Sequence, residues 1–363
     1  MFRRTAGTLA RPGLRRREIS RKLRVIEIDG AYGEGGGAIL RQAVALAAYA
    51  GRAVRVSRIR AGREPPGMKA QHVKAVEAVA AISGARVVGA ELRSMDLVFE
   101  PGPLRSGSYT FDIGTAGAAT LVLQSLLLPC LCRGGRFDLE IVGGTDVPWS
   151  PPADYLREVT LPAVGAFGVA DLGVVRRGYY PKGGGRLRAR FAGAARAPAP
   201  LSFLGSGAPA GVRGVSHAAS ILAPRRVAER QAEAARQAFG PDGVPVEIAV
   251  EYGEAYSPGS GITLWALAAP GAVLGASALG ARGKRAEDVG CEAARILQRE
   301  IASGAAVDRH LADQLVPFLA VAGGSIITSE VTPHLRSNVY VAERILGAAF
   351  EIAARRVTAH VQE

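Results

Sequence analysis

The feature that most restricts the fold of this chain is an order of elements that occurs twice in succession. Hydrophobic periodicity and glycine and proline breaks predict strand, helix, strand, helix, strand, strand in each stretch. Alternating strands and helices build an α/β fold, and a repeated order indicates a repeated structural unit. The first stretch has predicted strands at 24–29, 53–60, 85–92 and 96–101 and helices at 38–50 and 65–84. The second has predicted strands at 107–114, 136–144, 170–178 and 185–191 and helices at 116–132 and 151–168.

The rest of the chain predicts a third, partial copy of this unit and an inserted segment. The third copy has a helix near 308–324, a strand at 325–331, a helix at 337–347 and a strand at 349–361. Before it, residues 193–211 are rich in alanine, proline and glycine, as linkers are, and the elements that follow suffice for a small α/β domain. We therefore expect a basic tail at 1–23, a large domain at 24–200 and 304–363, and an inserted domain at 201–303.

Most of the positive charge lies in the N-terminal tail. Residues 1–24 contain nine arginines and lysines and a single acid, Glu18, and so account for eight of the net thirteen positive charges. This tail fits a nucleic-acid-binding arm, an arginine-rich transit peptide, a solvated extension or an overcalled start codon. The longest apolar run, 116–132, is too short to span a membrane. Three cysteines form no disulfide framework, which favours a reducing compartment and a cytoplasmic protein.

A glycine-rich segment, "GAYGEGGG" at 30–37, connects the first strand to the first helix. Glycines allow close approach to a ligand, and a helix start offers free N–H groups, so this segment favours phosphate binding. Glu34 would repel phosphate unless Mg²⁺ or Mn²⁺ lay between the two groups. The alternative role for Glu34 is simple pairing with the positive end of the helix.

The same segment partly matches the dinucleotide-binding fingerprint. Gly33, Gly35 and Ala38 have the required spacing, but the acid expected about 20 residues later is missing. The second strand region contains Arg58 and Arg60 instead, which leaves an NADP-dependent oxidoreductase open. The sequence contains no P-loop motif.

Three arginines are candidates for the phosphate pocket. Arg41 lies about one turn into the first helix, while Arg60 and Arg63 flank a glycine in the loop after the second strand. Arginine suits bidentate phosphate recognition, although each could equally form a surface ion pair. Gln71 and His72 follow on the next helix, as a buried cap or as a wall of the site.

Two histidines are candidates for chemistry. His334 precedes a predicted helix in "TPHLRSN", and a neutral imidazole there could attack phosphorus. His310 lies near Asp313 and Gln314, one helical turn later on the same face. A lone histidine in a loop is otherwise often structural.

Six segments resemble, in order and spacing, the motifs of the RNA 3′-terminal phosphate cyclase family. They are "DGAYGEGGGAILR", "IRAGREPPGMKAQH", "GGTDVPWSPPADYL", "RRGYYPKGGG", "HLADQL" and "VTPHLRSN". The resemblance covers roughly residues 24–363 and points to an archaeal-type member. It implies three βαβαββ-type repeats, related to the enolpyruvyl transferase architecture, with a small inserted α/β domain.

The resemblance also implies a three-step reaction. A histidine takes AMP from ATP and releases pyrophosphate, and the AMP then passes to an RNA 3′-phosphate. The vicinal 2′-hydroxyl finally closes a 2′,3′-cyclic phosphate and expels AMP, a step favoured by proximity. The implied cofactors are ATP and Mg²⁺ or Mn²⁺, the partner is RNA with a 3′-phosphate, and the protein is a monomer or homodimer that does not bind membranes.

By the same resemblance, His334 is the adenylated nucleophile and Glu34 the metal-binding acid. The matched phosphate-pocket positions are Arg41, Arg60, Arg63 and Gln71. The matched nucleotide positions are Gln124, Pro151, His310, Asp313 and Gln314, with Pro151 and His310 on opposite faces of adenine. Two alternatives share the architecture: a non-catalytic cyclase-like protein in ribosome assembly, and an enolpyruvyl transferase.

Overall fold

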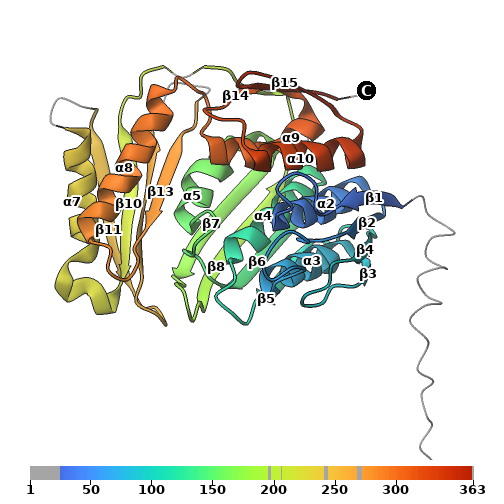
Figure 1. Ribbon diagram of the computed structural model, residues 1–363, viewed down its shortest axis with the longest axis horizontal. Coiled ribbons are helices and arrows are strands. Elements are labelled where there is room, and N and C mark those ends of the chain that lie inside the picture. Colours follow the sequence, from blue (N-terminus) through green and yellow to red (C-terminus); the bar gives the residue numbers. More distant parts are fainter. Residues whose placement is uncertain (1–24, 195–197, 206, 241–243, 268–271, 362–363) are drawn as a thin grey trace, which may run out of the picture.

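The computed structural model describes residues 25–194, 198–205, 207–240, 244–267 and 272–361, so the predicted basic tail lies outside the described residues. Within them the chain is a mixed α/β protein with four four-stranded sheets (Figure 1). Three of the sheets have the same strand order, and the fourth belongs to the inserted segment.

The first repeat forms a sheet of order β1-β2-β4-β3, in which β1 and β2 are parallel and the other pairs antiparallel. Its strands are β1 (Ile26–Asp29), β2 (Val54–Ser57), β3 (Arg86–Val88) and β4 (Leu97–Glu100), and its helices are α2 (Gly37–Ala50) and α3 (Ala70–Ser83). Both helices end at a glycine in the left-handed conformation, Gly51 and Gly84, as the sequence predicts for Gly84.

The second repeat has the equivalent order β5-β6-β8-β7. Its strands are β5 (Gly107–Asp112), β6 (Arg136–Gly143), β7 (Gly168–Arg176) and β8 (Gly185–Gly193). Its helices are α4 (Ala119–Cys132) and an irregular helix made of α5 (Ala153–Tyr155), a π-helical turn (Leu156–Thr160) and α6 (Leu161–Ala163). The expected helix at 151–168 is therefore interrupted by a π turn, a feature often found at functional sites.

The third repeat completes the pattern with the order β9-β14-β16-β15. Its elements are β9 (Leu201–Phe203), α9 (Arg309–Ala322), β14 (Gly324–Ile327), α10 (Pro333–Leu346), β15 (Ala349–Ala353) and β16 (Arg356–His360). The strand expected at 349–361 is in fact two, because the chain turns at Ala354, whose φ is +52°. Helix α10 begins at Pro333 rather than at 337, because Thr332 caps it.

Strand β9 lies in the segment that we expected to be a linker and the start of the inserted domain. It pairs in parallel with β14 and buries Leu201. A three-residue strand among alanines, prolines and glycines gives no periodic signal, which is why the sequence did not predict it. The inserted domain thus interrupts the third repeat after its first strand.

The inserted domain has the sheet order β11-β10-β12-β13. Its elements are β10 (Val212–Ala219), α7 (Val227–Phe239), β11 (Val246–Gly253), β12 (Ser260–Ala266), β13 (Gly275–Leu279) and α8 (Ala286–Ala302). Helices α7 and α8 pack against each other and have their own apolar core with the sheet, rich in alanine and leucine. A second, larger core joins the helices of the three repeats, where α2 packs against both α4 and α10.

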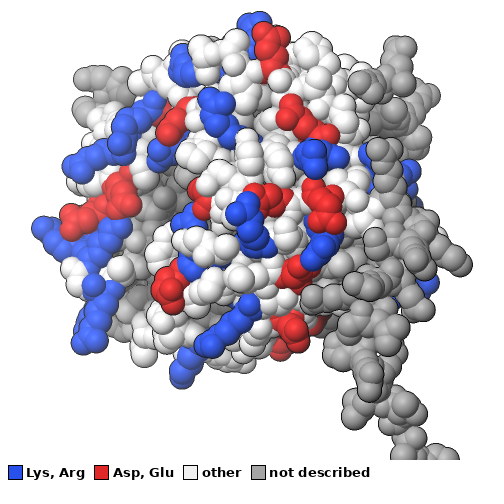
Figure 2. All heavy atoms as spheres, turned by 45° about the vertical axis from the view of Figure 1, so that its right-hand side comes forward, with Lys and Arg blue, Asp and Glu red and all other residues white. Residues whose placement is uncertain are grey.

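The surface carrying the first repeat is electrostatically mixed. Figure 2 shows basic and acidic side chains interspersed on this face, with no continuous basic patch among the described residues there. None of the described helices is both long and apolar enough to cross a membrane.

Candidate active site

A cavity of about 500 Å³ lies among helices α2, α4, α9 and the inserted domain. Seven of the eleven predicted site residues line it: Arg41, Gln124, Pro151, His310, Asp313, Gln314 and His334. The other four, Glu34, Arg60, Arg63 and Gln71, do not line it. The structure therefore brings together residues that are almost 300 positions apart in the sequence.

His334 lies in the first turn of α10, at one wall of the cavity. Thr332 caps this helix by accepting a hydrogen bond from the backbone N–H of Leu335 (2.9 Å). The same Thr332 hydroxyl donates to Asp313 Oδ1 (2.6 Å), which ties the start of α10 to α9. The imidazole is about half exposed and lies near the positive end of the helix.

Glu34 and Arg63 extend the site beyond the cavity wall. Glu34 Oε1 lies 2.8 Å from Nε2 of His334, and Oε2 lies 3.6 Å from the guanidinium of Arg63. The glycine loop is placed here because Gly33 has φ +57° and packs on α10, where a Cβ would come within 2.9 Å of Ser337 Oγ. The predicted nucleophile and the predicted metal-binding acid are thus direct neighbours.

Burial, more than the surrounding charges, favours the neutral form of the His334 ring. Burial lowers its pKa, Glu34 opposes this, and Arg41 and Arg63 lower the pKa further. Arg41 is itself desolvated, and burial lowers its pKa to about 10. No ion pair of Arg41 is found within the described ranges, so its cation faces the cavity uncompensated. A neutral imidazole beside an unpaired guanidinium suits attack on a phosphate ester.

Arg60 and Gln71 have local structural partners instead of facing the cavity. Arg60 Nη1 donates to the carbonyls of Pro65 and Gly67 (2.9 and 2.6 Å) and so holds the loop after β2. Gln71 Oε1 accepts from the N–H of Ala118 at the start of α4 (2.9 Å). These contacts position the loop of Arg63 and the start of α4.

His72 settles one of the alternatives left open by the sequence. Its Nδ1 accepts from the N–H of Lys69 (3.0 Å), so it caps α3. Burial, followed by Arg41, Arg60 and Lys69, lowers its pKa to about 3, so the ring stays neutral.

The far end of the cavity is held by the start of α9. Asp308 caps this helix through the N–H groups of His310 and Leu311. Its buried carboxylate also accepts from the hydroxyl of Tyr155 (2.7 Å) and from the N–H of Gly275 in the inserted domain (2.9 Å). His310 is therefore fixed by contacts from two repeats and from the inserted domain.

Asp313 has an unusual proton affinity. Burial raises its pKa to about 7, with the Thr332 hydrogen bond opposing and Asp308 and Glu34 adding to the rise. A raised folded pKa means that Asp313 contributes stability at low pH, which is lost as the pH rises through about 7.

We expect Asp313→Asn to remove this pH dependence, because an amide accepts the Thr332 hydrogen bond without becoming charged. The loss of unfolding free energy between pH 5.5 and 8.5 should shrink by about 1–2 kcal/mol relative to wild type. Urea unfolding at the two pH values measures this. Asp171→Asn, which removes an exposed charge, is the matched control, and an equal change in both variants would contradict the assignment.

Several residues of the cavity were not predicted as site residues. Trp149, Arg309 and Asn338 also line it, and Asn338 Nδ2 donates to the backbone carbonyl of Asp313 (2.8 Å). One feature of the sequence could have identified Trp149 as a site residue: the chain has only two tryptophans, and this one follows a glycine-rich turn. No feature of the sequence could have identified Arg309 and Asn338, because arginine and asparagine are common near the start of a helix.

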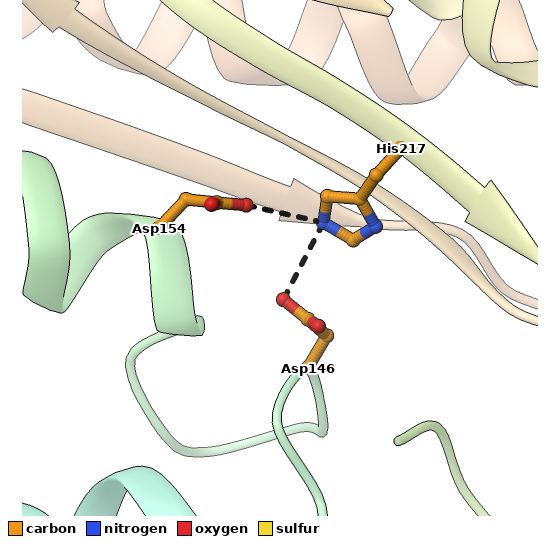
Figure 3. A group of neighbouring side chains, drawn as sticks. All are labelled: Asp146, Asp154 and His217. Atoms are coloured by element: carbon orange, nitrogen blue, oxygen red, sulfur yellow. Dashed lines mark ion pairs between the residues drawn. The ribbon is translucent and has the colours of Figure 1, made fainter. Parts of the chain in front are cut away.

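A second charged cluster lies at the contact between the two domains. Asp146, Asp154 and His217 lie within 4.8 Å of one another and are fully buried (Figure 3). His217 Nε2 is 3.4 Å from Asp146 and 3.8 Å from Asp154. The guanidinium of Arg177 pairs with both carboxylates, at 3.4 Å from Asp146 and 2.8 Å from Asp154. It also pairs with Glu251 of the inserted domain (2.7 Å).

This cluster is best described as an ion-pair network between domains. Burial alone would raise the pKa of Asp146, but His217 and Arg177 hold it well below its usual range. A metal ion at the same place would meet the guanidinium of Arg177, which repels it. The metal-ligating position predicted from the sequence is Glu34, outside this cluster.

Glu34 has the chemistry that a divalent cation needs. Its Oε1 is buried and receives no well-aligned hydrogen bond, although His334 Nε2 is near. One carboxylate oxygen, completed by phosphate oxygens and water, is a common arrangement for Mg²⁺. The residue present therefore fits the implied cation.

Comparisons with known proteins identify the family of this chain. Residues 32–352 match the family model for RNA 3'-terminal phosphate cyclase. A protein of that name from Archaeoglobus fulgidus is 47% identical over 336 residues, which cover 92% of this chain and 99% of the relative. Proteins of that name from Thermococcus onnurineus and Pyrococcus abyssi are 48% and 46% identical, over 90% of this chain and 95% of theirs. The chain is thus a member of the RNA 3'-terminal phosphate cyclase family.

Proposed function

We propose that this protein uses ATP to convert an RNA 3′-terminal phosphate into a 2′,3′-cyclic phosphate, with His334 as the carrier of AMP. The observation that supports this most is the neutral His334 imidazole at the start of α10, close to Glu34 and on the same cavity as the unpaired Arg41. Family membership supports the reaction class.

In the first step, a ring nitrogen of His334 bonds to the α-phosphorus of ATP and pyrophosphate leaves. The attacking nitrogen must have a free lone pair, so the pair between Nε2 and Glu34 either opens or leaves Nδ1 as the attacking atom. Arg41 stabilises the negative charge that develops on the transferred group. A cation bound to Glu34 would neutralise phosphate oxygens and so reduce their repulsion by the carboxylate.

In the second step, an oxygen of the RNA 3′-phosphate attacks the same phosphorus and takes AMP from His334. The terminal 2′-hydroxyl then loses its proton and attacks the RNA phosphorus; the new P–O bond closes the ring, the bond from that phosphorus to AMP breaks, and AMP leaves. Adenylation is needed because a phosphate monoester dianion is a poor electrophile without a leaving group. The adjacent hydroxyl makes closure fast and restricts the reaction to RNA.

The cavity divides these roles between its two ends. Arg41 in the cavity wall and Arg63, which pairs with Glu34 beyond it, hold phosphates, while His310, Pro151 and Asp313 hold the adenine. A non-catalytic scaffold would have no need of a neutral histidine beside an uncompensated arginine. The retained nucleophile and acid favour the enzyme.

The test is incubation of the protein with ATP, Mg²⁺ or Mn²⁺, and an RNA oligonucleotide carrying a labelled 3′-phosphate. We expect the label to become resistant to phosphatase as the cyclic product forms. A matched oligonucleotide with a 2′-deoxy terminal nucleotide should stop as the adenylated RNA. Failure to protect the label would contradict the function, and cyclisation of the deoxy substrate would contradict the mechanism.

A further inference from the structure

Trp149 is the most exposed large apolar side chain among the described residues that line the cavity. It is 97% exposed, yet it is also one of the cavity-lining residues, so its ring lies at the rim. A tryptophan can bury roughly 150–250 Å² of surface, and a large apolar surface that stays exposed often marks a binding site. The ring has no described partner within the chain.

The backbone at Trp149 is held in a costly conformation. Its φ is +63°, in the left-handed region that residues other than glycine avoid. The loop is anchored on both sides, since Thr145 N–H donates to Gly178 O (2.9 Å) and Ala153 N–H donates to Thr145 O (3.1 Å). Within it, Ser150 Oγ donates to Val147 O (2.9 Å), and Val147 is buried. The loop thus presents the ring outward while Pro151, two residues later, also lines the cavity.

We propose that Trp149 stacks on the terminal nucleobase of the RNA substrate and so positions its 3′-phosphate at the mouth of the cavity. This inference rests on the proposed function. The ATP-derived nucleotide is attached to His334 in the cavity wall, so the RNA end must approach across the exposed rim. Exposed aromatic rings bind single-stranded bases by stacking, with little sequence preference.

The rim also provides charge for the incoming strand. Arg309, which lines the same cavity, is 40% exposed; its Nε lies 3.9 Å from the buried Glu300, and its Nη1 pairs with the exposed Glu330 at 3.2 Å, a contact that an RNA phosphate can replace. His310 and Pro151 are assigned to adenine. Tyr155 and Phe318 also line the cavity but are buried, so Trp149 is the exposed aromatic ring there that a second base can reach. Stacking on Trp149 therefore distinguishes RNA binding from ATP binding.

The first experiment uses tryptophan fluorescence, because Trp149 and Trp265 are the only tryptophans. An RNA oligonucleotide with a 3′-phosphate should quench the wild-type emission, and Trp149→Phe should lose that quenching. The same oligonucleotide with an abasic 3′-terminal nucleotide should quench little. Equal quenching by ATP alone would overturn the proposal, as would equal quenching by the abasic oligonucleotide.

The second experiment measures the affinity for RNA, as the RNA concentration that gives half-maximal transfer of AMP from pre-labelled enzyme. Trp149→Gly removes the ring and suits the left-handed backbone, so the variant should fold. Its affinity for the RNA should fall roughly 5- to 150-fold, the effect of losing one base–aromatic stack. Trp149→Phe should recover most of the affinity, and the abasic oligonucleotide should bind wild type and Trp149→Gly about equally.

Two controls separate this proposal from the proposed function. Labelling of Trp149→Gly by ATP reports whether the enzyme still carries AMP. Any fall in this labelling should be at least roughly 5-fold smaller than the fall in affinity for RNA. Leu92→Ala removes another exposed apolar side chain, away from the residues that line the cavity, and should change neither step. If wild type carries no AMP at all, the proposed function fails. If labelling is normal but Trp149→Gly binds RNA as tightly as wild type, only the stacking proposal fails.

Discussion

Replacing His334 by alanine should abolish the transfer of AMP from ATP to the protein, with a fall of at least roughly 10³-fold in the rate of labelling. No other imidazole can take its place. His310 lies at the start of the neighbouring helix without the Glu34 contact, and His72 uses Nδ1 to cap α3. The cavity and Arg41 remain, so the variant should still bind ATP.

Mass spectrometry of the ATP-treated protein measures this directly, by locating AMP on a peptide that contains residue 334. His360→Ala is the matched control, because His360 is exposed at the end of β16. The control should be labelled as wild type is. Labelling of the His334→Ala protein at the wild-type rate, or AMP on another residue of the wild type, would reject His334 as the nucleophile.

Replacing Arg177 by methionine should cost about 3–5 kcal/mol of unfolding free energy, since it removes the buried guanidinium that pairs with Asp146 and Asp154. Arg177 is 7% exposed and contacts Asp146, Asp154 and Glu251. Two of these acids belong to the large domain and the third to the inserted domain. The loss should therefore weaken both the fold and the contact between the domains.

Urea unfolding measures the change, with Arg190→Met as the control on the neighbouring strand. Arg190 pairs with Asp171 at 2.8 Å, but both side chains are largely exposed, so its loss should cost less than about 1 kcal/mol. Adding Asp146→Asn to Arg177→Met should recover part of the lost stability, because Asp146 is the buried carboxylate that loses its guanidinium partner, whereas Asp154 still pairs with Arg157 (2.9 Å). Similar losses for the two arginine variants would show that the network contributes little.

The sequence was sufficient for most of the order of elements, because most helices of the repeats run for 14 residues and strands such as β6 and β8 alternate buried and exposed positions. The motifs that contain His334, Arg41 and Asp313 do converge on one cavity, as the resemblance implied, and the roles of these residues stay predictions. The sequence could not predict β9, because three residues beside a proline-rich stretch have no measurable period.

The direction of side chains in loops was also beyond the sequence. Arg60 has the composition of a phosphate ligand, yet its backbone, at φ +53°, directs the guanidinium to the carbonyls of its own loop. Trp149 was not recognised because its exposure depends on how the loop around it is anchored. Both features follow from backbone conformations that no residue pattern specifies.

The point at which the inserted domain enters the third repeat affects how nucleotides can be exchanged. Ala276 and Ser277 of β13 line the cavity opposite α9, and the N–H of Gly275 completes the shell of the buried Asp308 carboxylate. Pulling the two domains apart would deprive Asp308 of a donor and separate Arg177 from Glu251. In the proposed reaction, spent AMP and fresh ATP should therefore pass over the cavity rim at Trp149 while both halves of the molecule remain joined.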